Sequence, residues 1–315
     1  MKSPILPAVV VPLFISLTTH AEPLVYEGFD PSDPAAVLAA GQLAGATSKG
    51  FAADSKWAVT GSDDYTADFT GEGLSMQGLA ATGGAVNLGV GGSSKLGGVN
   101  IYRQSGVSVP AGSTFYGSFL FRNNQTESRY LTFLGVETGE DLPDDKGATR
   151  GAHRVADNDA AMLFTVSPDS FARDEEGVPG RASQGIKIWR SAAHGSKEMA
   201  QAEQPLNNGE TYLVVWRVAN AAGTEHAAGG AQQATMWILS QDNLNAVRAA
   251  GEPTEQALDS NNVARIAVDK GLRARLLESD FINIGATIGG GNKQSSSVYD
   301  EIRIGADMAS VLPAS

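Results

Sequence analysis

Apolar and polar residues alternate in short segments along most of the chain, and clusters of Gly, Pro, Asn and Asp separate these segments. A period of two, with many β-branched and aromatic residues, is typical of strands that bury one face. The pattern predicts strands at residues 24–30, 73–79, 85–90, 99–104, 113–122, 129–137, 160–167, 185–191, 211–219, 234–240, 281–289 and 297–305. Many strands with turn-rich joins indicate a β-sandwich or barrel.

Two stretches have a different pattern. Residues 33–45 offer Asp33 as an N-cap and Pro34 at the first helical position, and residues 260–280 carry leucines at helical offsets. Both are predicted to form short surface helices or irregular elements. Long polar links are expected at 138–159, 168–183, 192–209 and 220–233.

The alternation also assigns side chains to faces. In "STFYGSFLFR" it turns Phe115, Phe119 and Phe121 towards the core, and in "TYLVVWRVA" it places Trp216 on the same side as Val214, which predicts burial.

In two other predicted strands the same pattern separates polar positions from a line of isoleucines. Lys187 and Trp189 lie opposite the isoleucines of "GIKIWRS", and Asn283 lies opposite those of "FINIGATIG".

The last predicted strand, "SSSVYDEIRIG" (295–305), contains two adjacent acids. Strict alternation puts Val298, Asp300, Ile302 and Ile304 on one face, with Tyr299, Glu301 and Arg303 on the other. The two acids then point in opposite directions, so they do not form a catalytic carboxylate pair. Asp300 is instead predicted to be a buried carboxylate that accepts hydrogen bonds from a neighbouring loop, and Glu301 and Arg303, two apart on one face, to form a cross-strand charge ladder.

The N-terminus has the features of a secretory signal peptide. One lysine precedes an apolar run, and the small residues Thr19 and Ala21 occupy positions three before and one before a cut. Cleavage is predicted after Ala21, so residues 1–21 form the leader and residues 22–315 a single domain of 315 − 21 = 294 residues. Prolines at 4, 7 and 12 argue against a buried strand there.

Composition narrows the possible partners. The chain has no cysteine, so its stability comes from burial and hydrogen bonding without disulfides. A net charge of −12 without a basic cluster disfavours nucleic acid and anionic lipid. No second apolar run reaches about 18 residues, so no membrane span is expected in the mature, secreted or periplasmic and cell-surface protein.

The order of segments resembles a known superfamily. "LVYEGFD" at the start, "STFYGSFLFR", "GETYLVVWRV", "ATMWILS" and the final "SSSVYDEIRIG" with "ADMASVLP" are similar to the laminin-G-like, concanavalin A-like lectin/glucanase superfamily, in particular to secreted bacterial members. The resemblance covers about residues 24–312. It implies an all-β fold, a two-sheet antiparallel jelly-roll sandwich in which the first and last strands lie side by side and the last strand closes a sheet edge.

This fold also hosts enzymes, so function has to be argued from residues. Glucanases of the superfamily carry Glu-x-Asp-x-x-Glu on one strand, and neither "ETGED" nor "RDEEG" has that spacing. The Arg-rich and Gln-x-His strands of its lyases are also absent from the sequence. The histidines His153, His194 and His226 fall in predicted loops, where solvent exposure is the simpler expectation. Catalysis is therefore disfavoured, and a diverged glycan-cleaving enzyme stays an alternative.

Acidic loops offer a candidate calcium site. Many members of the superfamily hold Ca²⁺ on loops, and two loops here supply the hard oxygen ligands that this ion prefers, at Asp141, Asp144, Asp145, Asp157 and Asp159. The alternative is that these acids are only solvated.

A sugar site requires an exposed aromatic ring beside directed hydrogen-bonding groups. Trp189 with Lys187, Asn283 and Tyr299 is the best candidate set, although Trp189 can also belong to the core. The sequence thus predicts a secreted, non-catalytic module that binds polysaccharide or a cell-surface glycan. The alternative is a structural or adhesion protein without a sugar site.

Overall fold

The computed structural model describes residues 22–29, 42–43, 49–52, 55, 57–61, 65–79, 81, 84–90, 97–124, 130–137, 162–167, 185–190, 197–203, 206–207, 209–221, 232–272, 274–288 and 295–312. The strands are β1 (Val25–Glu27), β2 (Gln42–Leu43), β3 (Trp57–Gly61), β4 (Tyr65–Thr70), β5 (Ala85–Val90), β6 (Gly97–Gln104), β7 (Phe115–Asn123), β8 (Tyr130–Glu137), β9 (Met162–Ser167), β10 (Gly185–Arg190), β11 (Lys197–Glu203), β12 (Thr211–Ala219), β13 (Gln232–Leu239), β14 (Ala264–Leu272), β15 (Phe281–Ile288) and β16 (Ser295–Gly305). The helices are α3 (Gln241–Ala249), α4 (Glu255–Ser260) and α5 (Met308–Val311).

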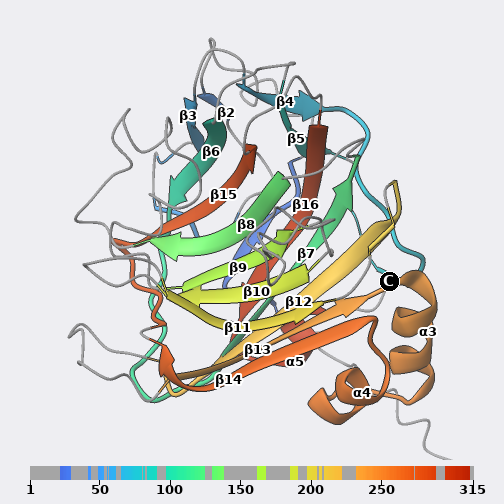
Figure 1. Cartoon of the computed structure of the whole chain (residues 1–315). Coiled ribbons are helices and arrows are strands. Elements are labelled where there is room, and N and C mark those ends of the chain that lie inside the picture. Colours follow the sequence, from blue (N-terminus) through green and yellow to red (C-terminus); the bar gives the residue numbers. More distant parts are fainter. Residues whose placement is uncertain are drawn as a thin grey trace, which may run out of the picture.

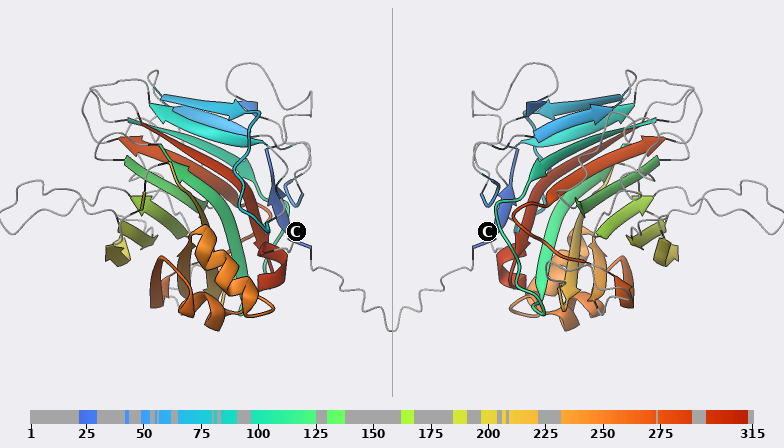
Figure 2. Two further views of the ribbon diagram at one scale, coloured as in Figure 1. Left: turned by 90° about the vertical axis from the view of Figure 1, so that its right-hand side faces the viewer. Right: turned by 90° about the vertical axis from the view of Figure 1, so that its left-hand side faces the viewer.

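The strands form two antiparallel sheets that pack face to face (Figures 1 and 2). Sheet A has the order β14-β13-β12-β7-β16-β5-β4, with β1 also paired to β16, and sheet B has the order β11-β10-β9-β8-β15-β6-β3-β2. The predicted two-sheet antiparallel sandwich is confirmed.

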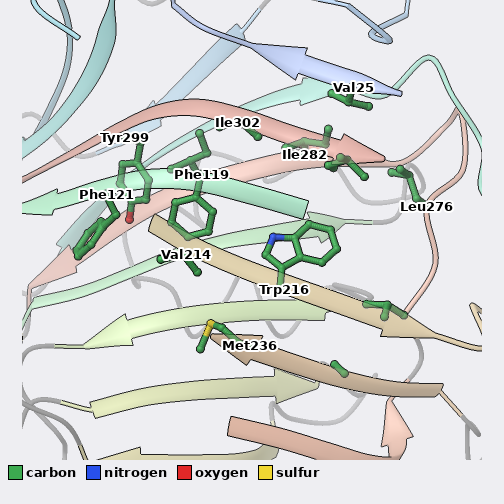
Figure 3. Close-up of a cluster of buried hydrophobic side chains, with 14 of the residues drawn as sticks. Val25, Phe119, Phe121, Val214, Trp216, Met236, Leu276, Ile282, Tyr299 and Ile302 are labelled. Carbon is green, nitrogen blue, oxygen red and sulfur yellow. The ribbon is translucent and has the colours of Figure 1, made fainter. Parts of the chain in front are cut away.

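A large apolar core lies between the sheets. Figure 3 shows Phe119, Phe121 and Tyr299 next to Trp216 of β12 and Ile282 of β15. The predicted inward direction of the β7 phenylalanines and the burial of Trp216, which is 0% exposed, are both confirmed.

The packing between β7 and β12 explains why β7 has a glycine among its phenylalanines. Gly117 pairs with Trp216, and a Cβ atom at position 117 would lie only 2.0 Å from the indole ring. The neighbouring Phe115 ring meets the same indole edge to face, with ring centroids 5.6 Å apart. A side chain at position 117 would therefore displace the tryptophan.

A second apolar layer covers the other face of sheet A. Leu120, Leu213, Val215, Trp237 and Leu239 of that face pack against the three helices and against the segment 73–79. In Figures 1 and 2, α3 and α4 lie together over one end of this sheet. The central strands of sheet A are therefore apolar on both faces, which accounts for near-continuous runs such as "LVVW".

Helices α3 and α4 were not predicted, although their caps are visible in the sequence. Ser240 and Asn243 form a reciprocal capping box at the start of α3, and the Thr254 side chain accepts the Ala257 N–H at the start of α4. Buried residues three apart, Leu244 and Val247, attach α3 to the sheet.

Two predicted elements are wrong. Residues 264–272 form strand β14 and not a helix, because Ile266 and Val268 alternate into the core; their pairing with β13 overrides the leucines at helical offsets. Residues 73–79 do not form a strand. Leu74 and Met76 are buried, but they cover the outer face of sheet A from a segment that contains a turn at residues 77–78 and makes a β-bridge only at Leu79.

Other expectations were incomplete. Strands β3, β4 and β11 were not predicted, and β11 occupies part of the segment expected to be a polar link, residues 192–209. The predicted helix at 33–45 lies mostly outside the described residues, and its described part, Gln42–Leu43, is a strand. The predicted leader, residues 1–21, also lies outside them.

The first and last strands lie side by side as expected, with Val25 opposite Ile304 and Glu27 opposite Ile302. The last strand does not close an edge, because β16 is paired on both sides, to β7 along one side and to β5 and then β1 along the other.

The predicted faces of β16 are wrong beyond Asp300. The pairing with β7 shifts between Asp300 and Arg303, and Glu301 has a φ of 53°, in the left-handed region. This β-bulge inserts a residue, so Ile302 and Ile304 point into the core while Val298 belongs to the outer layer. The alternation within one strand cannot reveal a bulge, because the position of the extra residue depends on how the strand pairs with its two neighbours.

Candidate functional site

The two outer faces of the sandwich differ in chemistry. The outer face of sheet A carries the apolar layer under the helices. The outer face of sheet B, defined by the positions that alternate with core residues such as Ile101 and Ile284, carries Asn100, Tyr102, Phe281 and Asn283 on its two central strands. Aromatic and amide groups thus meet on the outer face of sheet B.

Strand pairing arranges this face in rows. The Asn283 row crosses seven strands through Ala58, Tyr102, Asn283, Gly135, Leu163, Trp189 and Glu198. The neighbouring Gly285 row consists of Thr60, Asn100, Gly285, Phe133, Thr165, Lys187 and Gln201. Rows two residues apart along a strand share a face.

Three of the four predicted sugar-binding residues therefore occupy one face. Trp189 is in the row of Asn283, three strand spacings or about 14 Å away between Cα atoms. Lys187 is in the adjacent Gly285 row on the same strand as Trp189. For positions 187 and 189 the structure gives the place of the backbone in the sheet.

Tyr299, the fourth candidate, is not brought to this face. It lies on β16 in the other sheet, is 1% exposed and packs between Phe119 and Phe121, with ring centroids 5.9 and 5.6 Å away. Its hydroxyl crosses the core and donates to the carbonyl oxygen of Gly285 at 3.4 Å. The alternation assigned Tyr299 correctly to the face opposite Val298, but that face is the interior.

Sequence reasoning missed two aromatic residues of this face. Tyr102 and Phe281 are both half-buried, and their rings meet edge to face with centroids 5.8 Å apart. Asn283, the cross-strand partner of Tyr102, is fully buried. The signal was present, because Tyr102 lies opposite Ile101 in the predicted strand 99–104, but the pairing of that strand with β15 was needed to place it beside Asn283.

A buried ion pair fixes the strand that carries Tyr102. Arg103, the next residue on β6, points inward and donates from Nη1 to Glu27 Oε2 at 3.1 Å. The same carboxylate accepts the Trp57 indole N–H at 2.8 Å and the Phe29 backbone N–H at 3.0 Å. Burial raises the pKa of Glu27, and burial lowers the pKa of Arg103. With its oxygens satisfied by three donors, this pair links β1 of sheet A to β3 and β6 of sheet B.

A second buried polar cluster surrounds the bulge in β16. Asp300 is 0% exposed and accepts the backbone N–H of Leu74 at 2.8 Å and that of Glu301 at 2.7 Å, so the predicted buried acceptor of loop donors is confirmed. Burial, and next the charge of Glu301, raise the pKa of Asp300 to about 8.

Glu301 and Arg303 pair with one another along β16, and not in the cross-strand charge ladder that was expected. The two side chains form a buried ion pair, and the Tyr26 hydroxyl donates to the Glu301 carboxylate at 3.0 Å. Arg303 lies over the Tyr26 ring, 5.1 Å from its centroid. The acids of "DEIRIG" thus hold the first strand and the 73–79 segment against the last strand.

The acids predicted to bind calcium, Asp141, Asp144, Asp145, Asp157 and Asp159, lie outside the described residues, as do the three histidines considered as catalytic groups. Within the part of the chain that the structure describes, no group of three or more acidic or histidine side chains is placed to hold a metal ion.

No protein-family model and no curated protein matches this sequence. Distantly similar solved structures include the Emp47p carbohydrate recognition domain (10% identity, TM-score 0.43, 77% of this chain and 88% of that chain). They also include lectin II from Ulex europaeus (12% identity, TM-score 0.38, 78% of this chain and 100% of that chain). A third is the globular domain of T. cruzi calreticulin (11% identity, TM-score 0.44, 81% of this chain and 86% of that chain).

Proposed function

We propose that the protein is a secreted, non-catalytic glycan-binding module that binds sugar on the outer face of sheet B. The observation that carries this proposal is the contrast between the two outer faces. Sheet A is covered by the chain's own apolar layer, whereas the described part of sheet B presents Tyr102 and Phe281, half-buried, in rows that also contain amides.

The chemistry of these rows suits a polysaccharide. Aromatic rings can stack on the C–H faces of sugars, and amide and ammonium groups give directed hydrogen bonds to hydroxyls. The Asn283 and Gly285 rows supply both kinds of group, with Trp189 and Lys187 at one end and Tyr102 and Asn100 at the other. Because Asn283 itself is buried, its role in this proposal is to support the neighbouring Tyr102 and not to meet the ligand.

The test is a glycan-array screen of residues 22–315 followed by titration of the best ligand. Trp189→Ala and Tyr102→Ala should each weaken binding about tenfold, which corresponds to about 1.4 kcal/mol, because each removes one stacking surface. Tyr116→Ala is the matched control, since Tyr116 is a half-buried aromatic on the outer face of sheet A. It should leave the affinity unchanged.

A blank array with a folded protein would contradict the proposal and favour the structural or adhesive alternative. Equal losses in all three variants would indicate a general effect on folding. Running the array with calcium and again with chelator tests the proposed metal role of Asp141, Asp144, Asp145, Asp157 and Asp159. Glycan binding that is present with calcium and lost with chelator would support the metal role.

Secretion is part of the proposal. The first described strand, β1, begins at Val25, so cleavage after Ala21 would leave it intact. None of the helices described here has the length and apolar character needed to cross a bilayer. Intact-mass measurement of protein from the culture medium or periplasm should give a chain that begins at Glu22. A full-length chain retained in the cytoplasm would contradict export.

A further inference from the structure

A second polar row crosses sheet A at the end away from the helices. Strand pairing places Asp68, Asn87, Val298, Arg122 and Thr211 side by side on β4, β5, β16, β7 and β12. Val298 belongs to the outer apolar layer, so this Arg122 row lies on the outer face of sheet A. Figure 1 shows β4 and β5 at the opposite end of the molecule from α3 and α4.

The row continues the outer face as a polar surface. Asp68 is exposed, and Asn87, Arg122 and Thr211 are half-buried. Ser296 and the exposed Asn124 lie one row further from the helices and contact one another through their side chains at 3.4 Å. The outer face of sheet A therefore changes from apolar beneath the helices to polar along these positions.

Two atoms of the row are buried without a hydrogen-bond partner among the described residues, the Oδ1 of Asn87 and the Nε of Arg122. One is an acceptor and the other a donor. A buried polar atom without a partner is unfavourable in a folded protein, and such atoms are found where a ligand or a water completes the hydrogen bonding. Both atoms are closed to solvent in this arrangement, so a bound group can satisfy them only when the half-buried Asn87 and Arg122 side chains turn outward.

The charge of Arg122 is also uncompensated within the described part of the chain. Arg103, Arg217, Arg275 and Arg303 are each paired there with a carboxylate. No such pair involves Arg122, and Asp68 of its own row is three strand spacings, about 14 Å, away between Cα atoms. The half-buried guanidinium of Arg122 is therefore without a carboxylate partner in this part of the chain, and its Nε is without a hydrogen bond there.

We infer that the Arg122 row binds the carboxylate of an acidic sugar residue, such as a uronic acid in a polysaccharide. The planar guanidinium matches a carboxylate through paired N–H donors, and a ring hydroxyl of the same sugar donates to Asn87 Oδ1. Asn87 and Arg122 are two strand spacings apart, about 10 Å between Cα atoms, which a sugar ring and the long arginine side chain can span.

The negative net charge opposes this ligand only weakly at short range. At physiological salt, exposed charges further away than about 8 Å are largely screened, so the local arginine decides the contact. The site lies on a different sheet from the face proposed above for glycan binding, and neither proposal requires the other.

The experiment is a calorimetric titration of residues 22–315 with a trimer of galacturonic acid, and with a galactose trimer as the neutral probe. The wild-type protein should bind the acidic trimer, and binding should weaken when salt is raised from 50 to 500 mM. Arg122→Gln should weaken binding of the acidic trimer at least tenfold. Arg122→Lys should weaken it less, because lysine keeps the positive charge but lacks the paired N–H donors of the guanidinium. Asn87→Ala should weaken it several-fold.

Two controls separate this site from the rest of the molecule. Arg265→Gln alters an exposed arginine of β14, already paired with Asp259, and should leave affinity for the acidic trimer unchanged. Trp189→Ala should weaken only the binding of glycans to sheet B. The proposed site on sheet B and the proposed Arg122 site can therefore fail independently. The inference is overturned if the wild type does not bind the acidic trimer, or if Arg122→Gln binds it as tightly as the wild type with an unchanged thermal midpoint.

Discussion

The outer faces of the two sheets differ in how far their aromatic side chains are buried. On sheet A, Trp237 is 1% exposed beneath α4, and its indole N–H donates to Asp259 at 2.7 Å. On sheet B, the ring of Tyr102 is half-buried beside Phe281. An apolar outer face requires the chain to supply an apolar covering layer, whereas on sheet B the buried Asn283 lies beside rings that stay partly exposed. The difference indicates where this protein uses its own residues as cover and where a ligand can take that place.

Truncating one aromatic residue on each face should give the largest difference between the two sheets. Trp237→Ala should reduce the free energy of unfolding by about 3–5 kcal/mol, because it empties a buried volume and removes the indole hydrogen bond to Asp259, which keeps only Arg265 as a partner. Tyr102→Ala should cost less than about 1.5 kcal/mol, since its side chain is only partly buried. Urea unfolding of both variants measures the difference, and equal losses would show that the face of sheet B is also a core.

A second test uses the carboxyl group that attaches the cover to sheet A. The pKa of Asp300 is raised to about 8 in the folded protein, against about 3.9 in an unfolded chain. The unfolded state therefore releases this proton first, so the contribution of Asp300 to stability is fully present below pH 4 and is lost as the pH rises towards 8. The slope is at most about 1.4 kcal/mol per pH unit.

Asp300→Asn removes that titration but keeps one acceptor for the Leu74 N–H. We expect the wild type to lose stability between pH 5 and pH 8 and the variant to vary less over the same window, as followed by thermal midpoints in matched buffers. Parallel curves for the two proteins would contradict the assignment.

The smallest expected effect concerns the cap of the helix that covers sheet A. Ser240→Ala removes the side chain that accepts the Asn243 N–H and should cost about 1 kcal/mol. Ser240→Asp, which keeps an N-cap acceptor, should cost much less. Neither change should alter binding of a glycan to sheet B, because α3 packs on the other sheet. A loss of binding in Ser240→Ala alone would show that the two faces are coupled.

Much of the sandwich could be predicted, because alternation is a local property of a strand. The inward faces of β7 and β12 follow from residues such as Phe119 and Trp216 in their own segments. The candidate site could be predicted only in part. Lys187, Trp189 and Asn283 fall on one face of sheet B as the alternation requires, but Tyr102 and Phe281 join them through pairing between strands far apart in the sequence.

Neighbouring residues along one strand predict most of the longer strands, most of their buried faces and the role of Asp300 as an interior acceptor, because these features are local. The bulge at Glu301, the helix cover of sheet A and the two polar rows follow only from the assembled fold. Each depends on contacts between distant segments: Leu74 meets Asp300 across 226 positions, and Tyr26 meets Glu301 across 275. No local period records which strand will lie beside which, so the faces available to a ligand emerge only when the sheets are assembled.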